Sequence, residues 1–360
     1  MFYGSAVVAD PTESTMSELQ ALRATLERLL ERTHLTETEA NAVLVALTNP
    51  EMPAALAGAL LAALRAKGIT GDELRGFARA MRELARRPVV AETLRGRAID
   101  IVGTGGDASG SVNISTGTSL LVAACGTPVI KHGNRSISSR SGSADVLEKI
   151  GLSLPLDETR AGLCLERSGF TFLFAPHYHP AMKAIAPVRQ ALGVRTIFNI
   201  LGPLTNPAAP PFALVGAFNE FTAELMAQAL AGMPGLQRAL VVHGANGWDE
   251  PTPIGPFTVF DVREGRVRRG ERRPADYGLA TCTAADLAGG DAEFNAAALA
   301  RVLRGEDRGA HRDALLLGAS LALECTGEIT EPRDGIALAA AAIDDGRAAI
   351  VLRRIGEMTS

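Results

Sequence analysis

This 360-residue chain has few aromatic side chains, few cysteines, no long apolar run and no excess of positive charge. Aromatic residues make up 4% of the sequence, with one tryptophan, which argues against an extended platform for stacking bases. The 36 lysines and arginines are outnumbered by 40 aspartates and glutamates, so the net charge is −4. Because a protein that coats nucleic acid needs a basic excess, we expect no nucleic-acid partner.

The scarce cysteines also exclude a common type of metal site. They lie far apart and form none of the paired spacings that hold zinc, and we expect buried, reduced thiols in a cytoplasmic protein. No stretch reaches 18 consecutive apolar residues, and the first ten residues lack the basic start and long apolar segment of a signal peptide. The sequence therefore predicts a soluble protein without a membrane partner.

Hydrophobic residues, at 47%, are plentiful enough for a large core, and at about 150 residues per domain the length favours two domains. From about residue 15 to 95 the sequence shows only helical patterns. Thr36 and Thr70 each precede a glutamate by three residues, which is the capping-box signature of a helix start. An Ala/Leu run over residues 54–66 predicts another helix, which Lys67 and Gly68 would end.

From Ala98 onward, short apolar runs alternate with helical stretches. This alternation predicts an α/β fold with a largely parallel sheet, whose ligand sites lie at the carboxyl ends of the strands. A late β-hairpin is expected around Glu264-Gly265, and the last sixty residues are expected to be helical. The expected parallel strands are residues 99–102, 128–130, 170–174, 213–217 and 239–242.

A glycine cluster, Gly103-Thr104-Gly105-Gly106-Asp107, directly follows the first expected strand. Glycines let backbone N–H groups approach an anion closely, although a tight turn is an alternative interpretation. The cluster matches neither the Walker pattern nor a full GxGxxG, so ATP or a dinucleotide is disfavoured. Asn113, Ser115 and Thr116 open the next helix at the same sheet edge, and their polar groups favour a diphosphate ligand.

Cations and hydroxyl groups gather after the second expected strand. Lys131, His132, Asn134 and Arg135 follow it directly, and a run of serines, glycine and Arg140 extends to Ser143. This is a phosphate-binding composition, in which the arginines would add to the positive charge around an anionic substrate, and the alternative is a solvated polar loop.

Two adjacent carboxylates, Asp249 and Glu250, lie shortly beyond the last parallel strand. Such a pair suits Mg²⁺, which prefers oxygen ligands and keeps several waters, although an isolated pair is more often structural. His177 and His179 are too close in sequence to share a helix face, and no third ligand is evident, so they do not predict a metal site. Arg189 is a candidate for bidentate recognition of a carboxylate, the alternative being a solvated arginine.

Together these segments resemble the anthranilate phosphoribosyltransferases, from about residue 20 to the C-terminus. The family transfers the phosphoribosyl group of phosphoribosyl pyrophosphate (PRPP) to anthranilate in tryptophan biosynthesis. The resemblance implies a small helical domain, a larger α/β domain and a homodimer joined through the helical parts. It rests on GTGGD, NIST, KHGNRSISSRSGSADVLEKIGL, FLFAPHYHPAMK, PVRQALGVRTIFNILGPLTNP and VVHGANGWDE, which occur in the family's order and spacing.

The resemblance also implies a role for individual residues of this sequence. Lys131, Asn134 and Arg189 are the expected catalytic residues, and Arg189 would pair with the anthranilate carboxylate. Two Mg²⁺ ions are expected per site, with Ser115, Asp249 and Glu250 as ligands. PRPP would be held by Gly103, Gly105, Gly106, Asp107, Asn113, Ser115, Thr116, Lys131 and Ser143, and anthranilate by Gly103, His132, Asn134, His179, Arg189 and Gly202.

The resemblance places the anthranilate pocket at a hinge between two domains. The helical domain would comprise residues 1–97 and about 176–206, and the α/β domain residues 98–175 and 207–360. The sequence departs from the family pattern at residues 108–112 and 317–319, and its first fifteen residues have no counterpart. A pyrimidine nucleoside phosphorylase and a nucleic-acid-binding relative are the alternatives. The paired carboxylates disfavour the first, and the intact KHGN segment with net negative charge disfavours the second.

Overall fold

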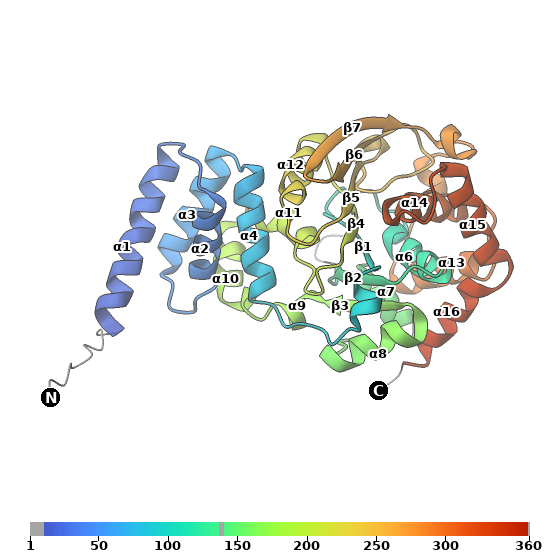
Figure 1. Cartoon of the computed structure of the whole chain (residues 1–360), viewed down its shortest axis with the longest axis horizontal. Coiled ribbons are helices and arrows are strands. Elements are labelled where there is room, and N and C mark those ends of the chain that lie inside the picture. The colour runs from blue at the N-terminus through green and yellow to red at the C-terminus, as the bar shows by residue number, and fades with distance from the viewer. Residues whose placement is uncertain (1–10, 137–139, 359–360) are drawn as a thin grey trace.

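The computed structural model describes residues 11–136 and 140–358. A bundle of helices occupies one end of an elongated molecule, and an α/β domain forms the other end (Figure 1). Among the described residues, no helix combines the length and the apolar character that a membrane crossing requires. The four cysteines are free, but the expectation that all are buried is wrong for Cys125 and Cys282, which are half-buried.

The N-terminal helices are α1 (Pro11–Leu30), α2 (Glu37–Leu47), α3 (Ala54–Lys67), α4 (Gly71–Glu83) and the short α5 (Glu92–Arg95). Both expected capping boxes are present, at the starts of α2 and α4. The α4 capping residue Glu73 is buried, and its carboxylate accepts hydrogen bonds from Lys67 Nζ and the Leu35 backbone N–H, each at 2.8 Å. This carboxylate therefore joins three segments of the bundle.

A seven-stranded sheet with the order β3-β2-β1-β4-β5-β6-β7 forms the centre of the α/β domain. The first five strands are parallel, and β6 and β7 form the expected antiparallel hairpin. The expected strands are all found, with slightly different ends. They are β1 (Ile99–Gly103), β2 (Val129–Gly133), β3 (Phe170–Phe174), β4 (Phe212–Gly216), β5 (Arg238–His243), β6 (Phe257–Arg263) and β7 (Arg266–Arg272).

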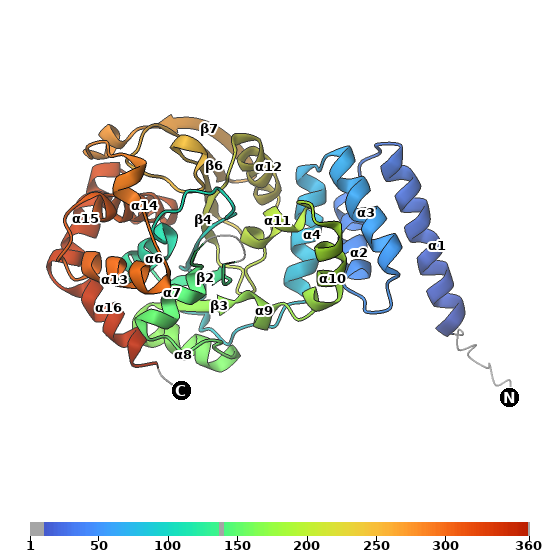
Figure 2. The ribbon, with the colours of Figure 1, turned by 180° about the vertical axis from the view of Figure 1, so that it is seen from behind.

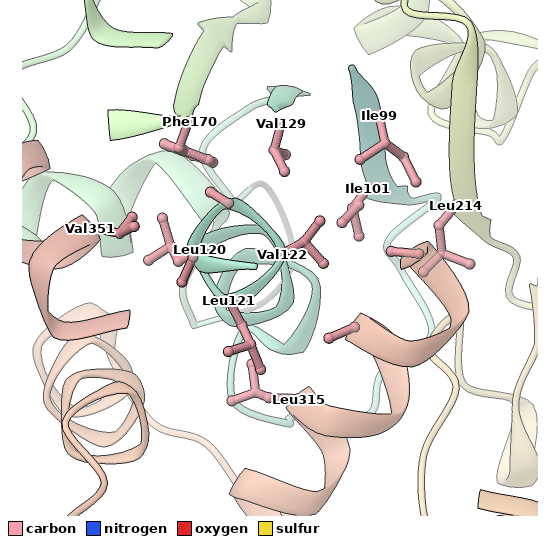
Figure 3. Close-up of a cluster of buried hydrophobic side chains, with 14 of the residues drawn as sticks. Ile99, Ile101, Leu120, Leu121, Val122, Val129, Phe170, Leu214, Leu315 and Val351 are labelled. Carbon is pink, nitrogen blue, oxygen red and sulfur yellow. The ribbon is translucent and has the colours of Figure 1, made fainter. Parts of the chain in front are cut away.

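Helices cover both faces of this sheet, because the parallel strands are apolar on both sides. On one face, α6 lies between the strands and the C-terminal helices, with Leu121 against Leu315 and Val122 toward Ile101 (Figure 3). The helices on this face of the sheet are α6 (Ile114–Ala124), α7 (Ser143–Ile150), α8 (Glu158–Ser168), α13 (Ala292–Leu303), α14 (Ala310–Thr326), α15 (Pro332–Asp344) and α16 (Arg347–Gly356).

On the other face, α12 (Glu220–Ala231) packs between the sheet and α4, so one apolar core runs from the bundle to the strands. The segment after β3 returns to the bundle, where α10 (Met182–Leu192) packs on α3 (Figure 2). It begins with α9 (Ala175–Tyr178) and continues through α11 (Phe198–Leu201), which contacts α4, to a 3-10 turn at Gly202–Leu204. The polar residues singled out in the sequence lie where this segment meets the strand ends.

Candidate active site

Three strand ends carry glycine where the loop containing Asp249 and Glu250 crosses them. A Cβ atom at Gly216, which ends β4, would overlap the Asp249 carbonyl oxygen. One at Gly244, just after β5, would overlap the Glu250 carbonyl oxygen, and one at Gly103 would overlap the Asp249 carboxylate. The glycines therefore let the carboxylate loop lie directly on the sheet edge, which no side chain would permit.

We expect Gly216→Ala to displace this loop. Overpacking of this kind costs roughly 1–3 kcal/mol of stability, and it should also reduce turnover at least tenfold, because the carboxylates move. The matched control is Gly270→Ala on β7, where an added Cβ meets nothing within 4 Å. Steady-state kinetics and urea unfolding of both variants measure the effect, and equal behaviour of the two would contradict the close approach.

The two carboxylates contact the start of α6 and the glycine loop, which is the Gly103–Asp107 segment after β1. Asp249 Oδ2 accepts hydrogen bonds from Gly105 N at 2.5 Å and from Thr104 Oγ1 at 3.3 Å. Glu250 Oε1 accepts one from Ser115 N at 3.0 Å, in the first turn of α6. Burial, with repulsion from Asp107, raises the pKa of Asp249 to about 7, and burial with repulsion from Asp249 raises the pKa of Glu250 to about 8.

Asp249 is buried and Glu250 is half-buried, and two carboxylates that repel each other in this way have the chemistry of a site for a hard dication. Neither forms an ion pair within 4 Å in the described part of the chain. The described residues also contain no group of three or more His, Cys, Asp or Glu side chains that could hold a metal ion. The pair of carboxylates nevertheless fits Mg²⁺, which proteins often bind through one or two carboxylates, the remaining ligands being waters and substrate oxygens.

The expected phosphate-binding residues converge on the same sheet edge. Gly105 and Gly106 have φ angles of +68° and +72°, so the loop turns through backbone conformations that favour glycine. Asn113 Nδ2 donates to the Ser141 carbonyl at 3.2 Å, and Thr116 Oγ1 donates to Ser143 Oγ at 3.0 Å. These bonds join the start of α6 to the segment that leads into α7.

Lys131 corrects a sequence expectation. It was expected in a loop after the second strand, but β2 continues to Gly133, and Lys131 is a buried strand residue opposite Phe172 of β3. Its Nζ donates to the Ile101 carbonyl. Burial lowers the pKa of Lys131, and the nearby carboxylates, of which Asp100 acts most strongly, partly offset this effect. The cation therefore lies beneath the carboxylate loop rather than in solvent.

Two of the residues expected to contact anthranilate form a buried histidine pair. The rings of His132 and His179 meet edge to face, with centroids 5.0 Å apart. Burial lowers the pKa of His179 to about 4 and holds the pKa of His132 well below its ordinary value, so both rings are neutral at pH 7. The 3-10 turn at Gly202–Leu204 contacts β2, and the Gly202 backbone acts against burial by raising the pKa of His132.

Arg189, on α10, is half-buried and stacks on an aromatic ring. Its Cζ lies 4.8 Å from the centre of the Phe198 ring, and burial lowers its pKa. No ion pair of Arg189 is found in the described ranges, which leaves its charge available for a carboxylate. Among these residues no hydrogen bond or ring contact joins Arg189 to Asn134, which is exposed at the end of β2.

The expectation that Arg135 adds to the charge around the substrate is wrong. Its guanidinium bonds to Asp145 at 3.0 Å and to Glu148 at 2.6 Å, both on α7. These carboxylates neutralise the cation, which the serine-rich composition of the segment did not indicate. Part of the same segment, residues 137–139, lies outside the described residues.

Asp100 and Asn206 were missed in the sequence. Asp100 accepts a hydrogen bond from His132 N at 3.2 Å and another from Asn206 Nδ2 at 2.9 Å. The same Asn206 amide donates to the Ile130 carbonyl at 2.8 Å. This buried network ties β1 and β2 to the segment after the 3-10 turn, and burial raises the pKa of Asp100 to about 6. In the sequence, the sign of this network is the single carboxylate of Asp100 within the apolar run 99–102.

Two further residues support the site without a local signal. Asn295, buried on α13, donates from Nδ2 to Asn113 Oδ1 at 2.8 Å and so orients that amide. Arg82, in the last turn of α4, donates from Nε to the Leu204 carbonyl at 2.9 Å. Burial lowers the pKa of Arg82 to about 10. Both residues lie on helices that are distant in sequence from the groups they hold.

Comparison with known proteins agrees with this arrangement. Residues 23–85 match the helical bundle domain of a glycosyl transferase family, and residues 95–349 match its a/b domain. An anthranilate phosphoribosyltransferase from Pelotomaculum thermopropionicum is 43% identical over 338 residues, which is 94% of this chain and 96% of the relative. One from Desulforudis audaxviator is 44% identical with the same coverage.

Solved structures give the same result. The crystal structure of anthranilate phosphoribosyltransferase from Thermus thermophilus has a TM-score of 0.85 and 41% identity, and the match covers 92% of this chain and 98% of that one. The Saccharomyces cerevisiae enzyme in complex with PRPP and Mg has a TM-score of 0.85 and 25% identity, over 94% of this chain and 98% of that one. A further structure of the yeast enzyme holds 4-fluoroanthranilate.

Proposed function

This chain belongs to the anthranilate phosphoribosyltransferase family, and from that premise we propose that it transfers the 5-phosphoribosyl group of PRPP to the amine of anthranilate. The bond between ribose C1 and the pyrophosphate oxygen breaks, a bond from the anthranilate nitrogen to C1 forms, and the nitrogen loses a proton. The products are N-(5-phosphoribosyl)anthranilate and pyrophosphate. The observation that carries the proposal is the Asp249–Glu250 pair, which contacts the glycine loop and the start of α6 close to the buried Lys131.

The residues at the strand ends would hold PRPP. The positive-φ loop at Gly105 and Gly106 lets the backbone approach an anion closely, and Lys131 provides a buried cation. Asp249, Glu250 and Ser115 are the proposed protein ligands of two Mg²⁺ ions. When bound, Mg²⁺ supplies charge neutralisation to the leaving pyrophosphate. Preorganised charge of this kind, placed where negative charge develops, is expected to supply most of the rate acceleration.

Anthranilate, the acceptor, would bind where the helical bundle meets the strand ends, on the side of the bundle. Arg189 would pair with the anthranilate carboxylate through its planar fork, and this guanidinium already lies over the Phe198 ring. The neutral His132–His179 pair offers a polar but uncharged surface for the ring, and we place Asn134 and Gly202 in the same pocket. An aryl amine is neutral at pH 7 with a usable lone pair, so no strong general base is required.

Arg189→Ala should raise the KM for anthranilate roughly 10- to 150-fold, as expected for a lost charged hydrogen bond worth about 1.5–3 kcal/mol. The KM for PRPP should stay within about twofold, because Arg189 has no contact with the glycine loop among the described residues. Lys183→Ala, which removes an exposed cation from the same helix, is the matched control. Equal increases in both KM values would refute the assignment.

A fluorescence assay that follows anthranilate consumption tests the function directly. We expect consumption only when both PRPP and Mg²⁺ are present. A parallel assay offers uridine or thymidine with phosphate, because a nucleoside phosphorylase of the same fold is the alternative. Phosphorolysis of either nucleoside, without anthranilate turnover, would overturn the proposal.

We further propose that residues 1–97 and about 176–206 act as one helical unit and that two copies associate through it. In support, α10 and α11 pack on α3 and α4, and the bundle exposes apolar side chains at Leu30 and Val45, which are 62% and 44% exposed. Sedimentation equilibrium is expected to give twice the mass of one chain, and a monomer would contradict the association.

A further inference from the structure

One arginine of the helical side reaches across to the glycine loop. Arg195 lies between α10 and α11, and its Nη2 donates a hydrogen bond to the Gly106 carbonyl at 3.0 Å. Its Cζ lies 4.7 Å from the centre of the Phe218 ring, which follows β4. A single guanidinium therefore bridges the loops that follow two neighbouring strands of the sheet.

The helical bundle fixes the backbone of Arg195. The Arg195 carbonyl accepts a hydrogen bond from Arg65 Nη1 on α3, and the next residue, Thr196, donates its N–H to Asn199 Oδ1 at 2.9 Å. The guanidinium forms no ion pair in the described parts of the chain, and its side chain is exposed. The guanidinium therefore contacts the carbonyl and the ring of the other domain.

The glycine loop is therefore held by hydrogen bonds on two sides. Gly105 N donates to the Asp249 carboxylate on one side, and the Gly106 carbonyl accepts from Arg195 on the other. The Gly106 carbonyl and the Asp107 N–H belong to the same planar trans peptide, so they point in opposite directions. A cation on the carbonyl therefore directs the Asp107 N–H away from the helical side and strengthens it as a donor.

We propose that Arg195 is a positioning residue for PRPP, which it serves by fixing the Gly105–Asp107 peptides from the opposite domain. This inference rests on the proposed function of the same loop. Without Arg195, glycines at φ of +68° and +72° leave the loop free to adopt other conformations, and PRPP must order it on binding. Arg195 affects PRPP far more than anthranilate, because its contacts lie on the glycine loop and on Phe218.

Three variants test the assignment: Arg195→Ala, Arg195→Lys and Phe218→Leu, with Lys183→Ala as the charge-matched control. Arg195→Ala should raise the Kd of PRPP, measured by calorimetry with Mg²⁺, and the KM for PRPP about tenfold. The KM for anthranilate and kcat should stay within about twofold. Arg195→Lys should recover part of the loss, because one N–H donor remains, and Phe218→Leu should lie between Arg195→Ala and the wild type.

The outcomes also separate this inference from the proposed function. An unchanged PRPP affinity in Arg195→Ala, or equal changes in the KM of both substrates, would overturn the inference while wild-type turnover still supports the function. Hydrogen exchange of the ligand-free protein gives a second readout. Amides of residues 104–107 should exchange faster in Arg195→Ala than in the wild type or in Lys183→Ala. Equal exchange in all three proteins would overturn the proposed anchoring even if the wild type has no activity.

Discussion

Changing Asp249 to Asn and Glu250 to Gln in one chain should abolish Mg²⁺-dependent turnover, a loss of at least about a thousandfold. The amide side chains keep the size of the carboxylates and an oxygen that can accept from Gly105 N and Ser115 N. They remove the negative charge that a dication requires. Turnover of PRPP and anthranilate across a Mg²⁺ titration measures the effect, with Glu264→Gln at an exposed turn as the control.

The same variant should remain folded. The pKa values of Asp249 and Glu250, about 7 and 8, lie above the ordinary values near 4, so the native state binds more protons than the unfolded state between about pH 4 and 8. The metal-free wild type should therefore lose stability as the pH rises through this window, and the double variant should lose less. Unchanged Mg²⁺-dependent turnover would remove both carboxylates from the site, and unfolding of the variant at pH 7 would contradict the electrostatic argument.

Lys131→Met should lower kcat/KM for PRPP at least about a hundredfold, because the buried cation beneath the carboxylate loop is lost and the leaving pyrophosphate is less well neutralised. Asp100 would also lose its strongest neighbouring positive charge. An uncompensated buried group of this kind costs about 1–3 kcal/mol of stability.

Kinetics and urea unfolding separate these two effects of Lys131→Met. Lys149→Met, which removes a half-exposed cation from α7, is the control. A variant that stays folded at the assay temperature and keeps kcat/KM within about threefold of the wild type would show that Lys131 does not act on PRPP.

Much of the fold follows from signals that are local in the sequence. A capping box needs two residues three positions apart, and a buried parallel strand needs a short apolar run bounded by glycine, so both are visible without the tertiary structure. Residues that follow parallel strands meet at one edge of the sheet, which predicts a ligand site there. The assignment of Asp249 to the same site as Gly105, 144 residues away, came from the family resemblance, because an isolated carboxylate pair is by itself more often structural.

Other features of the site depend on pairings that no local pattern records. Lys131 is a strand residue because β2 stays in register with β3 as far as Gly133, and Arg135 is neutralised because α7 places two carboxylates beside it. The charge of a residue is visible in the sequence, but its neighbours in space are not.

The scarcity of positive charge excluded a nucleic-acid coat, and the sequence by itself also determined the α/β fold, the helical start of the chain and the strand ends that carry the phosphate and carboxylate groups. Only the tertiary structure decided which charges remain available. It neutralises Arg135, buries Lys131 and sets Arg195 on the Gly106 carbonyl, 89 residues away in sequence. Local patterns determine secondary structure, whereas the partner of a charge depends on how distant elements pack.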